Sequence, residues 1–160
     1  AETGPAVKRV KAGDRVVMEP MEWCGECYAC RSGRRNVCAR LQVYGVNRDG
    51  AFCEYIVLPE RIVHKVDDRL DWHEAVLIEP FTIGAQANWR GGVAAGDTVF
   101  IMGAGTIGLC SLQVAKLKGA TCIVSDLSDD KLAYAQSLGA DYTLNPLKGD
   151  IAAELERITG

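Results

Sequence analysis

The sequence predicts an α/β fold in which a β-rich part is followed by the first half of a doubly wound parallel sheet. Three observations predict it: β-branched and aromatic runs in the first half, a cysteine-rich loop inserted among them, and alternating strand-like and helix-like patterns in the second half. The 160 residues are 48% hydrophobic and 24% charged, so the chain can bury a core. We expect the first part to span residues 1–80 and the second residues 81–160.

A Gly-Asp turn that feeds a strand opens the β-rich part. Val10–Val16 contains this turn, and Val93–Val99 repeats its chemistry without forming a domain repeat. Further strands are expected at Phe52–Leu58 and Ile62–Val66, which Pro59 separates. Helices are expected only after these runs.

Two helices should lead from the first part into the second. Asp71 and Glu74 have the spacing of a capping box, which predicts a helix start. Pro80 should break or kink this helix, because proline lacks the N–H that a helix interior requires. A connecting helix is then expected at Phe81–Trp89.

The second part reads as strand, helix, strand, helix, with glycines closing the helices. This order is typical of the start of a parallel doubly wound sheet. The expected strands are Val99–Met102, Thr121–Ser125 and Asp141–Leu144, and the expected helices are Thr106–Lys118, Ser128–Leu138 and Ile151–Ile158, the last capped by Asp150.

Four cysteines, spaced Cys24-x2-Cys27-x2-Cys30-x7-Cys38, form the strongest motif in the chain. Three sulfurs on one tight loop and a fourth that returns to it can surround one ion. Four thiolates leave no open coordination position, so the motif predicts a structural zinc site over residues 24–38. An iron–sulfur cluster is one alternative, although the ferredoxin run ends in a shorter gap followed by proline. Redox disulfides are another.

The remaining cysteines and the histidines have less specific surroundings. Cys53, Cys110 and Cys122 have apolar neighbours and are expected to be small buried hydrophobes. His64 and His73 are expected to be structural or surface residues rather than ligands. Arginines beside the cysteine motif either offset the charge of a tetrathiolate zinc site or form a solvated basic face; they are Arg31, Arg34, Arg35 and Arg40.

A glycine motif follows the first strand of the second part. Gly103, Gly105 and Gly108, with Thr106 and Ile107 between the last two, stand directly after an apolar strand and open a helix. Such glycines let the backbone approach a pyrophosphate, whose charge is met by free N–H groups at the helix N-terminus. The motif predicts a dinucleotide site, and the alternative is a packing turn without a ligand.

Asp126 ends the second strand of this part. A carboxylate there accepts hydrogen bonds from the adenosine ribose hydroxyls and repels a 2′-phosphate. Asp129 and Asp130 add negative charge, and Lys131 is the only nearby base, so the local field favours NAD over NADP. In the alternative interpretation, Asp126 caps the following helix.

Charge and composition argue against two classes of partner. A formal net charge of −3 provides no basic surface for nucleic acid. The apolar stretch that begins at Thr98 is interrupted by glycines and polar residues, so no membrane segment is expected. The start of the chain lacks a secretory signal and the cysteine pattern favours a metal over disulfides, so we expect a cytoplasmic protein.

Taken together, the cysteine spacing, the Gly-Asp turns, Leu77–Pro80 and the glycine motif resemble zinc-dependent medium-chain alcohol dehydrogenases over essentially the whole chain. The tracts Tyr44–Phe52 and Glu54–Tyr55 resemble the sorbitol, threonine and sugar-acid dehydrogenase branch more than ethanol dehydrogenases. The resemblance implies part of a GroES-like catalytic domain with a structural zinc lobe, followed by part of a Rossmann domain that binds NAD.

The resemblance also implies roles for single residues. Glu79 matches a position that ligates a catalytic zinc or holds its bound water, and Ile107, Asp126 and Lys131 match positions that commonly touch the cofactor. The family's other catalytic zinc ligands would lie before Ala1. We therefore expect an internal portion of an enzyme, without turnover by itself, whose parent is a homo-oligomer, either a dimer or a tetramer.

The activity implied for the parent is hydride transfer between a small polyol, secondary alcohol or sugar acid and NAD. Zinc would polarise the substrate hydroxyl. One alternative is a zinc-stabilised nucleotide-binding scaffold without catalysis. Another is a zinc-free quinone reductase of the same superfamily, which the cysteine lobe opposes because such a loop has little purpose without its metal.

Overall fold

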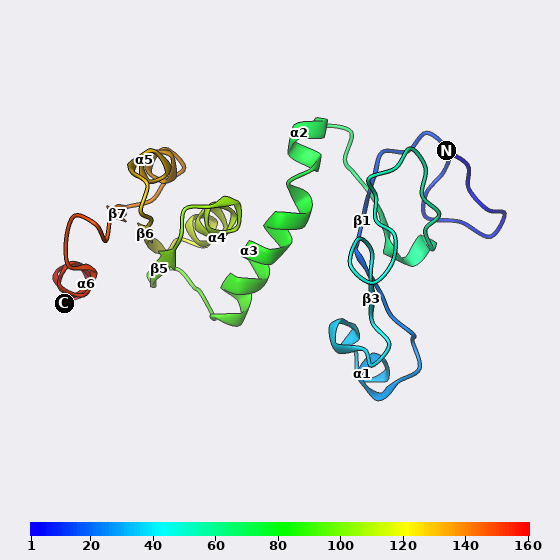
Figure 1. Cartoon of the computed structure of the whole chain (residues 1–160), viewed down its shortest axis with the longest axis horizontal. Coiled ribbons are helices and arrows are strands. Elements are labelled where there is room, and N and C mark those ends of the chain that lie inside the picture. Colours follow the sequence, from blue (N-terminus) through cyan, green and yellow to red (C-terminus); the bar gives the residue numbers. More distant parts are fainter. The chain divides into compact units, whose positions relative to one another are not determined.

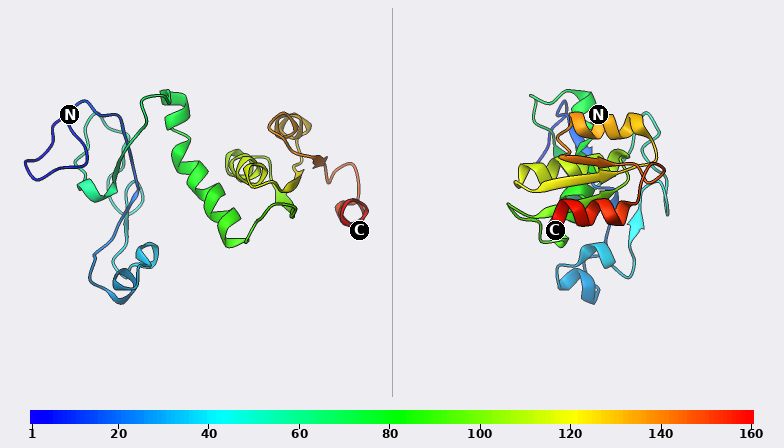
Figure 2. Two further views of the ribbon diagram at one scale, coloured as in Figure 1. Left: turned by 180° about the vertical axis from the view of Figure 1, so that it is seen from behind. Right: turned by 90° about the vertical axis from the view of Figure 1, so that its left-hand side faces the viewer.

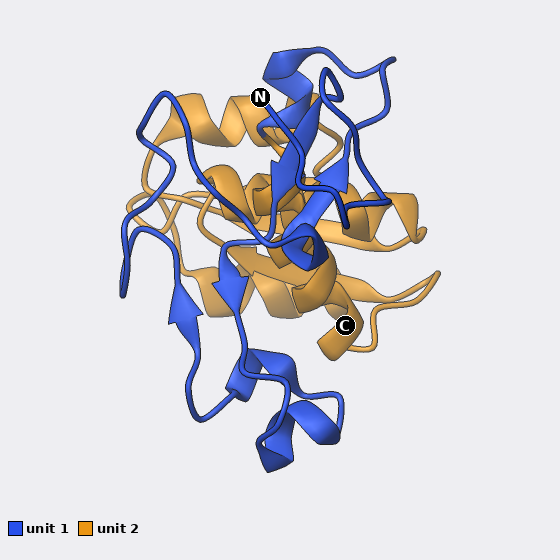
Figure 3. Cartoon of the chain, turned by 90° about the vertical axis from the view of Figure 1, so that its right-hand side faces the viewer, with its two compact units in different colours: residues 1–76 blue, residues 77–160 orange.

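A computed structural model describes all 160 residues, and the chain divides into two compact units (Figure 3). Unit 1 is Ala1–Val76 and unit 2 is Leu77–Gly160. The division falls close to the expected boundary after residue 80. None of the helices combines the length and the apolar character that crossing a bilayer requires.

Unit 1 consists of two small antiparallel strand pairs joined by loops and single helical turns. β1 pairs with β4, and β2 pairs with β3. The strands are β1 (Val16–Met18), β2 (Met21–Glu22), β3 (Gln42–Val43) and β4 (Val63–Lys65), and the helical turns are α1 (Tyr28–Arg31), Arg35–Val37, Glu60–Ile62 and α2 (Trp72–Ala75).

The two Gly-Asp turns share their chemistry, as predicted. The Asp14 carboxylate accepts a hydrogen bond from the N–H of the third residue before it at 2.9 Å, and Asp97 does the same at 2.8 Å. Gly13 and Gly96 both have left-handed φ angles, 92° and 88°, which glycine adopts without the strain that a Cβ would cause. Each turn then directs the chain into a strand.

The predicted strand at Phe52–Leu58 is wrong. The segment contains bends and irregular backbone and pairs with no strand, and the side chains of Phe52, Tyr55 and Val57 are exposed. A strand requires a partner whose backbone groups are free to bond, and no strand in residues 1–160 provides them here. The adjoining prediction at Ile62–Val66 is confirmed as β4, with Ile62 closing the preceding helical turn.

The capping box and the helix break expected near Pro80 are both confirmed. The Asp71 carboxylate accepts from the Glu74 N–H at 2.8 Å, and the Glu74 carboxylate accepts from the Asp71 N–H at 2.8 Å. A second helix, α3 (Ile78–Arg90), contains Pro80 in its first turn. α2 ends at Ala75, so the helix that starts after Asp71 does not run on through Pro80. The connecting helix begins three residues earlier than expected, because the N–H groups of a first turn have no intrahelical acceptor and a proline there removes no bond.

Unit 2 has the predicted alternating order. Its three strands form a parallel sheet in the order β5-β6-β7. Figure 1 shows α4 and α5 on one face of this sheet and α6 on the other, and the right-hand view of Figure 2 shows α5 and α6 on opposite sides. The elements are β5 (Thr98–Met102), α4 (Thr106–Leu117), β6 (Thr121–Ser125), α5 (Asp129–Ser137), β7 (Tyr142–Leu144) and α6 (Ile151–Thr159).

The core of unit 2 lies between the central strand β6 and helix α4. Cys122 and Val124 on β6 and Leu112 on α4 are fully buried in one cluster there. α3 packs closely on α4 at Gly84, where a Cβ would lie 2.7 Å from the backbone N of Ser111. This close approach of the two helices requires glycine.

The cysteines outside the motif divide into two groups. Cys110 and Cys122 are buried, and burial raises the pKa of both thiols, as expected of small core residues. Cys53 is exposed, so the expectation of a buried residue is wrong there. It lies in the irregular segment Phe52–Leu58, which pairs with no strand.

Candidate functional site

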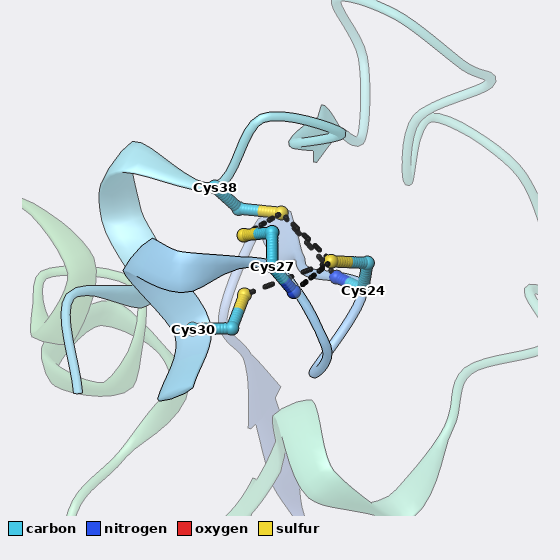
Figure 4. A group of neighbouring side chains, drawn as sticks. All are labelled: Cys24, Cys27, Cys30 and Cys38. Carbon is cyan, nitrogen blue, oxygen red and sulfur yellow. Dashed lines mark hydrogen bonds between the residues drawn. The ribbon is translucent and has the colours of Figure 1, made fainter. Parts of the chain in front are cut away.

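The first candidate site is the group of four cysteines in unit 1. Cys24 follows β2, Cys27 is the N-cap of α1, Cys30 lies within α1, and Cys38 follows the helical turn at Arg35–Val37. Figure 4 shows their sulfurs turned toward one another. The predicted loop therefore brings all four ligands together.

The sulfur positions suit a single tetrahedral ion. Cys38 Sγ lies 3.5 Å from Cys24 Sγ, Cys24 Sγ is 3.9 Å from Cys30 Sγ, and Cys27 Sγ is 3.9 Å from Cys38 Sγ. All four ligand atoms lie within 4.8 Å of one another. With Zn–S bonds of about 2.3 Å, a tetrahedron has S–S edges of about 3.8 Å. The cysteines are free thiols rather than disulfides, and the donor set fits zinc.

Backbone N–H groups donate hydrogen bonds to two of the sulfurs and stabilise their thiolate form, which is the form that binds a cation. The Cys27 N–H donates to Cys24 Sγ at 3.4 Å and lowers the pKa of that thiol to about 6, because the donor stabilises the thiolate. The Arg40 N–H donates to Cys38 Sγ at 3.3 Å. Desolvation raises the pKa of Cys30 to about 12. A divalent ion bound to the four sulfurs would deprotonate the set.

The arginines around the sulfur cage have different partners. Arg40 forms an ion pair with Glu26, and the Arg35 guanidinium lies 4.9 Å from the centre of the Trp23 ring. Arg31 and Arg34 are exposed. All four arginines are exposed, as expected of a solvated basic face, and the offset of thiolate charge by their guanidinium groups stays a prediction.

The second candidate site is the glycine turn between β5 and α4 in unit 2. Gly103 has a φ of 101°, and Gly105 is the N-cap of α4. A Cβ on Gly108 would lie 1.9 Å from the Gly103 carbonyl oxygen, so no other residue fits there. Thr106 and Ile107 form the exposed start of the helix, whose first turn has neither an acidic residue nor a side-chain cap. Its N–H groups can receive an anion.

An open pocket of about 560 Å³ lies beside this turn. Asp126 accepts hydrogen bonds from the Ala104 N–H at 2.9 Å and the Ser128 N–H at 3.0 Å, and these bonds lower the pKa of its carboxyl. Helix α5 is capped by the Ser128 hydroxyl. The pocket is lined by Gly103, Ser125, Asp126, Leu127, Ser128, Lys131 and Pro146.

Three of the seven predicted cofactor residues, Gly103, Asp126 and Lys131, line this pocket, and Glu79 lies apart from it. Glu79 is exposed in the first turn of α3 and belongs to no set of converging ligands. His64 and His73 are exposed and likewise belong to no such set. The sulfur cage is the one group of three or more metal-ligating side chains in the chain.

The sequence did not identify four residues that line the pocket, Ser125, Leu127, Ser128 and Pro146, nor the backbone N–H of Ala104 that donates to Asp126. Leu127 and Ser128 follow β6, and Pro146 follows β7. The carboxyl ends of parallel strands lie at one edge of the sheet, so the residues just after each predicted strand were the available signal. No sequence signal identifies the Ala104 N–H as the partner of Asp126.

Two known families match this chain, one within each unit. Residues 1–68 match the family described as the alcohol dehydrogenase GroES-like domain, and residues 106–160 match the family described as zinc-binding dehydrogenase. The sorbitol dehydrogenase of Bacillus subtilis is 40% identical over 161 residues, which cover 99% of this chain and 46% of the relative. The chain spans less than half the length of the curated relatives it matches.

Two solved structures have the same fold. A short chain alcohol dehydrogenase from Escherichia coli CFT073, crystallised with NADH, has a TM-score of 0.91 and 37% identity; the match covers 98% of this chain and 47% of that one. A protein from Sinorhizobium meliloti 1021, crystallised with NADP, has a TM-score of 0.88 and 38% identity; the match covers 94% and 44%. Relatives of this chain therefore bind either nicotinamide dinucleotide.

Proposed function

Because this chain belongs to the zinc-dependent medium-chain alcohol dehydrogenase family, we propose that it supplies the structural zinc lobe and half of the cofactor domain of an NAD-linked oxidoreductase. The whole enzyme would transfer a hydride between NAD and a polyol, secondary alcohol or sugar acid. The observation that carries the proposal is the presence, in one polypeptide, of four converging sulfurs and a glycine turn at the uncapped N-terminus of a helix.

In this proposal the thiolates of Cys24, Cys27, Cys30 and Cys38 hold zinc as a structural element. With all four positions taken by sulfur, that ion has no place for substrate. The N–H groups of Cys27 and Arg40 stabilise the sulfur charge through the hydrogen bonds described above. The role of this lobe is therefore to fold and hold unit 1.

The cofactor site proposed for unit 2 begins at the glycine turn. Gly103, Gly105 and Gly108 with Thr106 and Ile107 let the diphosphate approach the N-terminus of α4. Asp126 accepts hydrogen bonds from the adenosine ribose hydroxyls, using the lone pairs that its two backbone donors leave free. Its charge repels a 2′-phosphate, while Lys131 at the pocket wall is the one base there. NAD is therefore favoured over NADP.

Glu79 is proposed to act toward a catalytic zinc in the whole enzyme, either as a ligand or by holding the bound water. Its exposed position in the first turn of α3 leaves the carboxylate accessible. When bound, a catalytic zinc polarises the substrate hydroxyl and NAD accepts the hydride. Within residues 1–160 no set of ligands other than the closed sulfur cage converges, so we propose that this chain alone has no turnover.

Two further properties of the parent belong to the proposal, namely a cytoplasmic location and a dimeric or tetrameric assembly. The alternative function, a zinc-stabilised nucleotide-binding scaffold without catalysis, agrees with the same cage and pocket. The two functions predict different results for a longer protein that also contains the segments found in the relatives. An oxidoreductase would then be active, whereas a scaffold would remain inactive. A zinc-free quinone reductase is disfavoured by four sulfurs arranged for one ion.

Metal analysis and calorimetry on the purified protein test the proposal. We expect one zinc per chain and binding of NADH at least about 10-fold tighter than NADPH, a ratio that corresponds to roughly 1.4 kcal/mol. No reduction of NAD by sorbitol or threonine is expected from this chain alone. A protein that folds without zinc and binds neither dinucleotide would overturn the proposal.

A further inference from the structure

The Asp126 side chain takes part in the pairing of β5 and β6 at the point where the two strands end. The last bond between backbone groups runs from the Gly103 N–H to the Ser125 carbonyl oxygen, at 2.6 Å. One residue further along, the Ala104 N–H donates instead to Asp126 Oδ2 at 2.9 Å. The carboxylate thus supplies the acceptor that a longer strand would have supplied.

The Ala104 N–H depends on this acceptor. Ala104 is 2% exposed, and a buried N–H without a partner is costly because water cannot replace the lost bond. Ala104 lies between Gly103, whose φ is left-handed, and Gly105, the N-cap of α4. Fixing its N–H therefore fixes the conformation of the turn at which a diphosphate would bind.

The second carboxylate oxygen anchors the other side of the pocket. Asp126 Oδ1 accepts from the Ser128 N–H at 3.0 Å, and Ser128 caps α5. The Asp126 N–H itself donates to the Leu144 carbonyl of β7 at 3.3 Å. One residue is thus bonded to the turn after β5, the turn after β6 and the end of β7.

We propose that Asp126 is a positioning residue for the glycine turn, in addition to the ribose contact assigned to it above. This inference rests on the proposed dinucleotide function. If it holds, a substitution at Asp126 that admits a 2′-phosphate also loosens the turn that receives the diphosphate. Such a variant would then bind NADPH less tightly than the original protein binds NADH.

Amide hydrogen exchange of the ligand-free protein tests the inference without any cofactor. In D126A the Ala104 amide should exchange about 10-fold faster or more, because its charge-assisted bond is lost. In D126N the increase should be smaller, because the amide oxygen can still accept. The control is D130N, which removes a neighbouring exposed charge and should leave Ala104 unchanged. Equal protection of Ala104 in D126A and the original protein would overturn the inference.

A ligand without a ribose separates the two roles of Asp126. Inorganic pyrophosphate should bind D126A several-fold more weakly than D126N, although both variants have lost the same charge. Equal affinities would limit Asp126 to ribose recognition and overturn the inference. If D126A does not fold, D126N is compared with D130N instead. Faster exchange of the Ala104 amide in D126N supports the inference, and equal exchange overturns it. Failure of the original protein to bind NADH would refute the proposed function and leave the exchange result to stand by itself.

Discussion

The two units of this protein reach a folded state by different means. Unit 1 has six buried hydrophobic residues, short strand pairs and a cage of four sulfurs. Unit 2 has thirteen, with a contiguous cluster between a parallel sheet and its helices. A segment with so small a core needs another source of folding free energy, and bound metal can supply it. We therefore expect one chain to combine a part whose folding depends on metal with a part whose folding depends on its core.

The largest effect is expected from breaking the cage. C38S replaces its most buried sulfur and should reduce the zinc content well below one per chain. Structural zinc in small domains contributes on the order of 10 kcal/mol of folding free energy, so the lobe should unfold while unit 2 remains. Metal analysis and circular dichroism measure this. C53S is the matched control, since Cys53 lies outside the cage, and a C38S protein with full zinc would contradict the prediction.

A smaller effect, confined to unit 2, is expected from G108A. The added Cβ would collide with the Gly103 carbonyl oxygen, which should lower the free energy of unfolding by about 3 kcal/mol. G105A is the control, because nothing lies within 4 Å of a Cβ there and the φ of Gly105 is −79°. We expect G105A to keep its stability and to weaken NADH binding. Urea unfolding and calorimetry measure the two effects.

Core truncation gives an effect of similar or slightly smaller size. L112A removes a fully buried side chain from the α4 face and should cost about 3 kcal/mol, with zinc present or chelated. L117A, on the same helix but 87% exposed, should change the stability little. A loss that appears only in the chelated protein would mean that the two units do not fold independently. Thermal unfolding of unit 2 reports the result.

The smallest effect concerns Asp141. The Lys116 ammonium, followed by the Cys122 N–H, holds the pKa of this carboxyl below its ordinary value of 3.8. Its stabilisation is therefore complete above that value and is lost as the pH falls through the lowered pKa. The side chain is 36% exposed, so D141N should cost only about 1 kcal/mol or less at neutral pH. The difference between D141N and the original protein should vanish in acid.

The sequence predicted unit 2 better than unit 1, for a physical reason. Strands and helices such as Thr121–Ser125 and Thr106–Leu117 follow local hydrophobic periodicity and glycine stops, which are legible in the sequence. Phe52–Leu58 has the composition of a strand, but pairing depends on a partner that composition does not reveal. The helix break near Pro80 was predicted, but the connecting helix begins at Ile78 instead of Phe81, because a proline is tolerated in the first turn of a helix.

The candidate sites divide in the same way. Cysteine spacing is a local property, so the cage was predicted completely. The pocket beside Asp126 involves residues that only the sheet brings together, such as Leu127 and Pro146, and a backbone donor at Ala104 that no side chain marks. Spacing can identify a ligand set on one loop, whereas a pocket assembled from several strand ends requires the fold.

Hydrogen exchange measured by mass spectrometry, with and without a zinc chelator, is the most direct test. It asks whether unit 1 depends on bound metal to fold and unit 2 on its hydrophobic core. We expect chelation to abolish protection between β2 and β3 and to leave protection in β5, β6 and α4 unchanged. Equal loss in both units, or no loss in either, would contradict it.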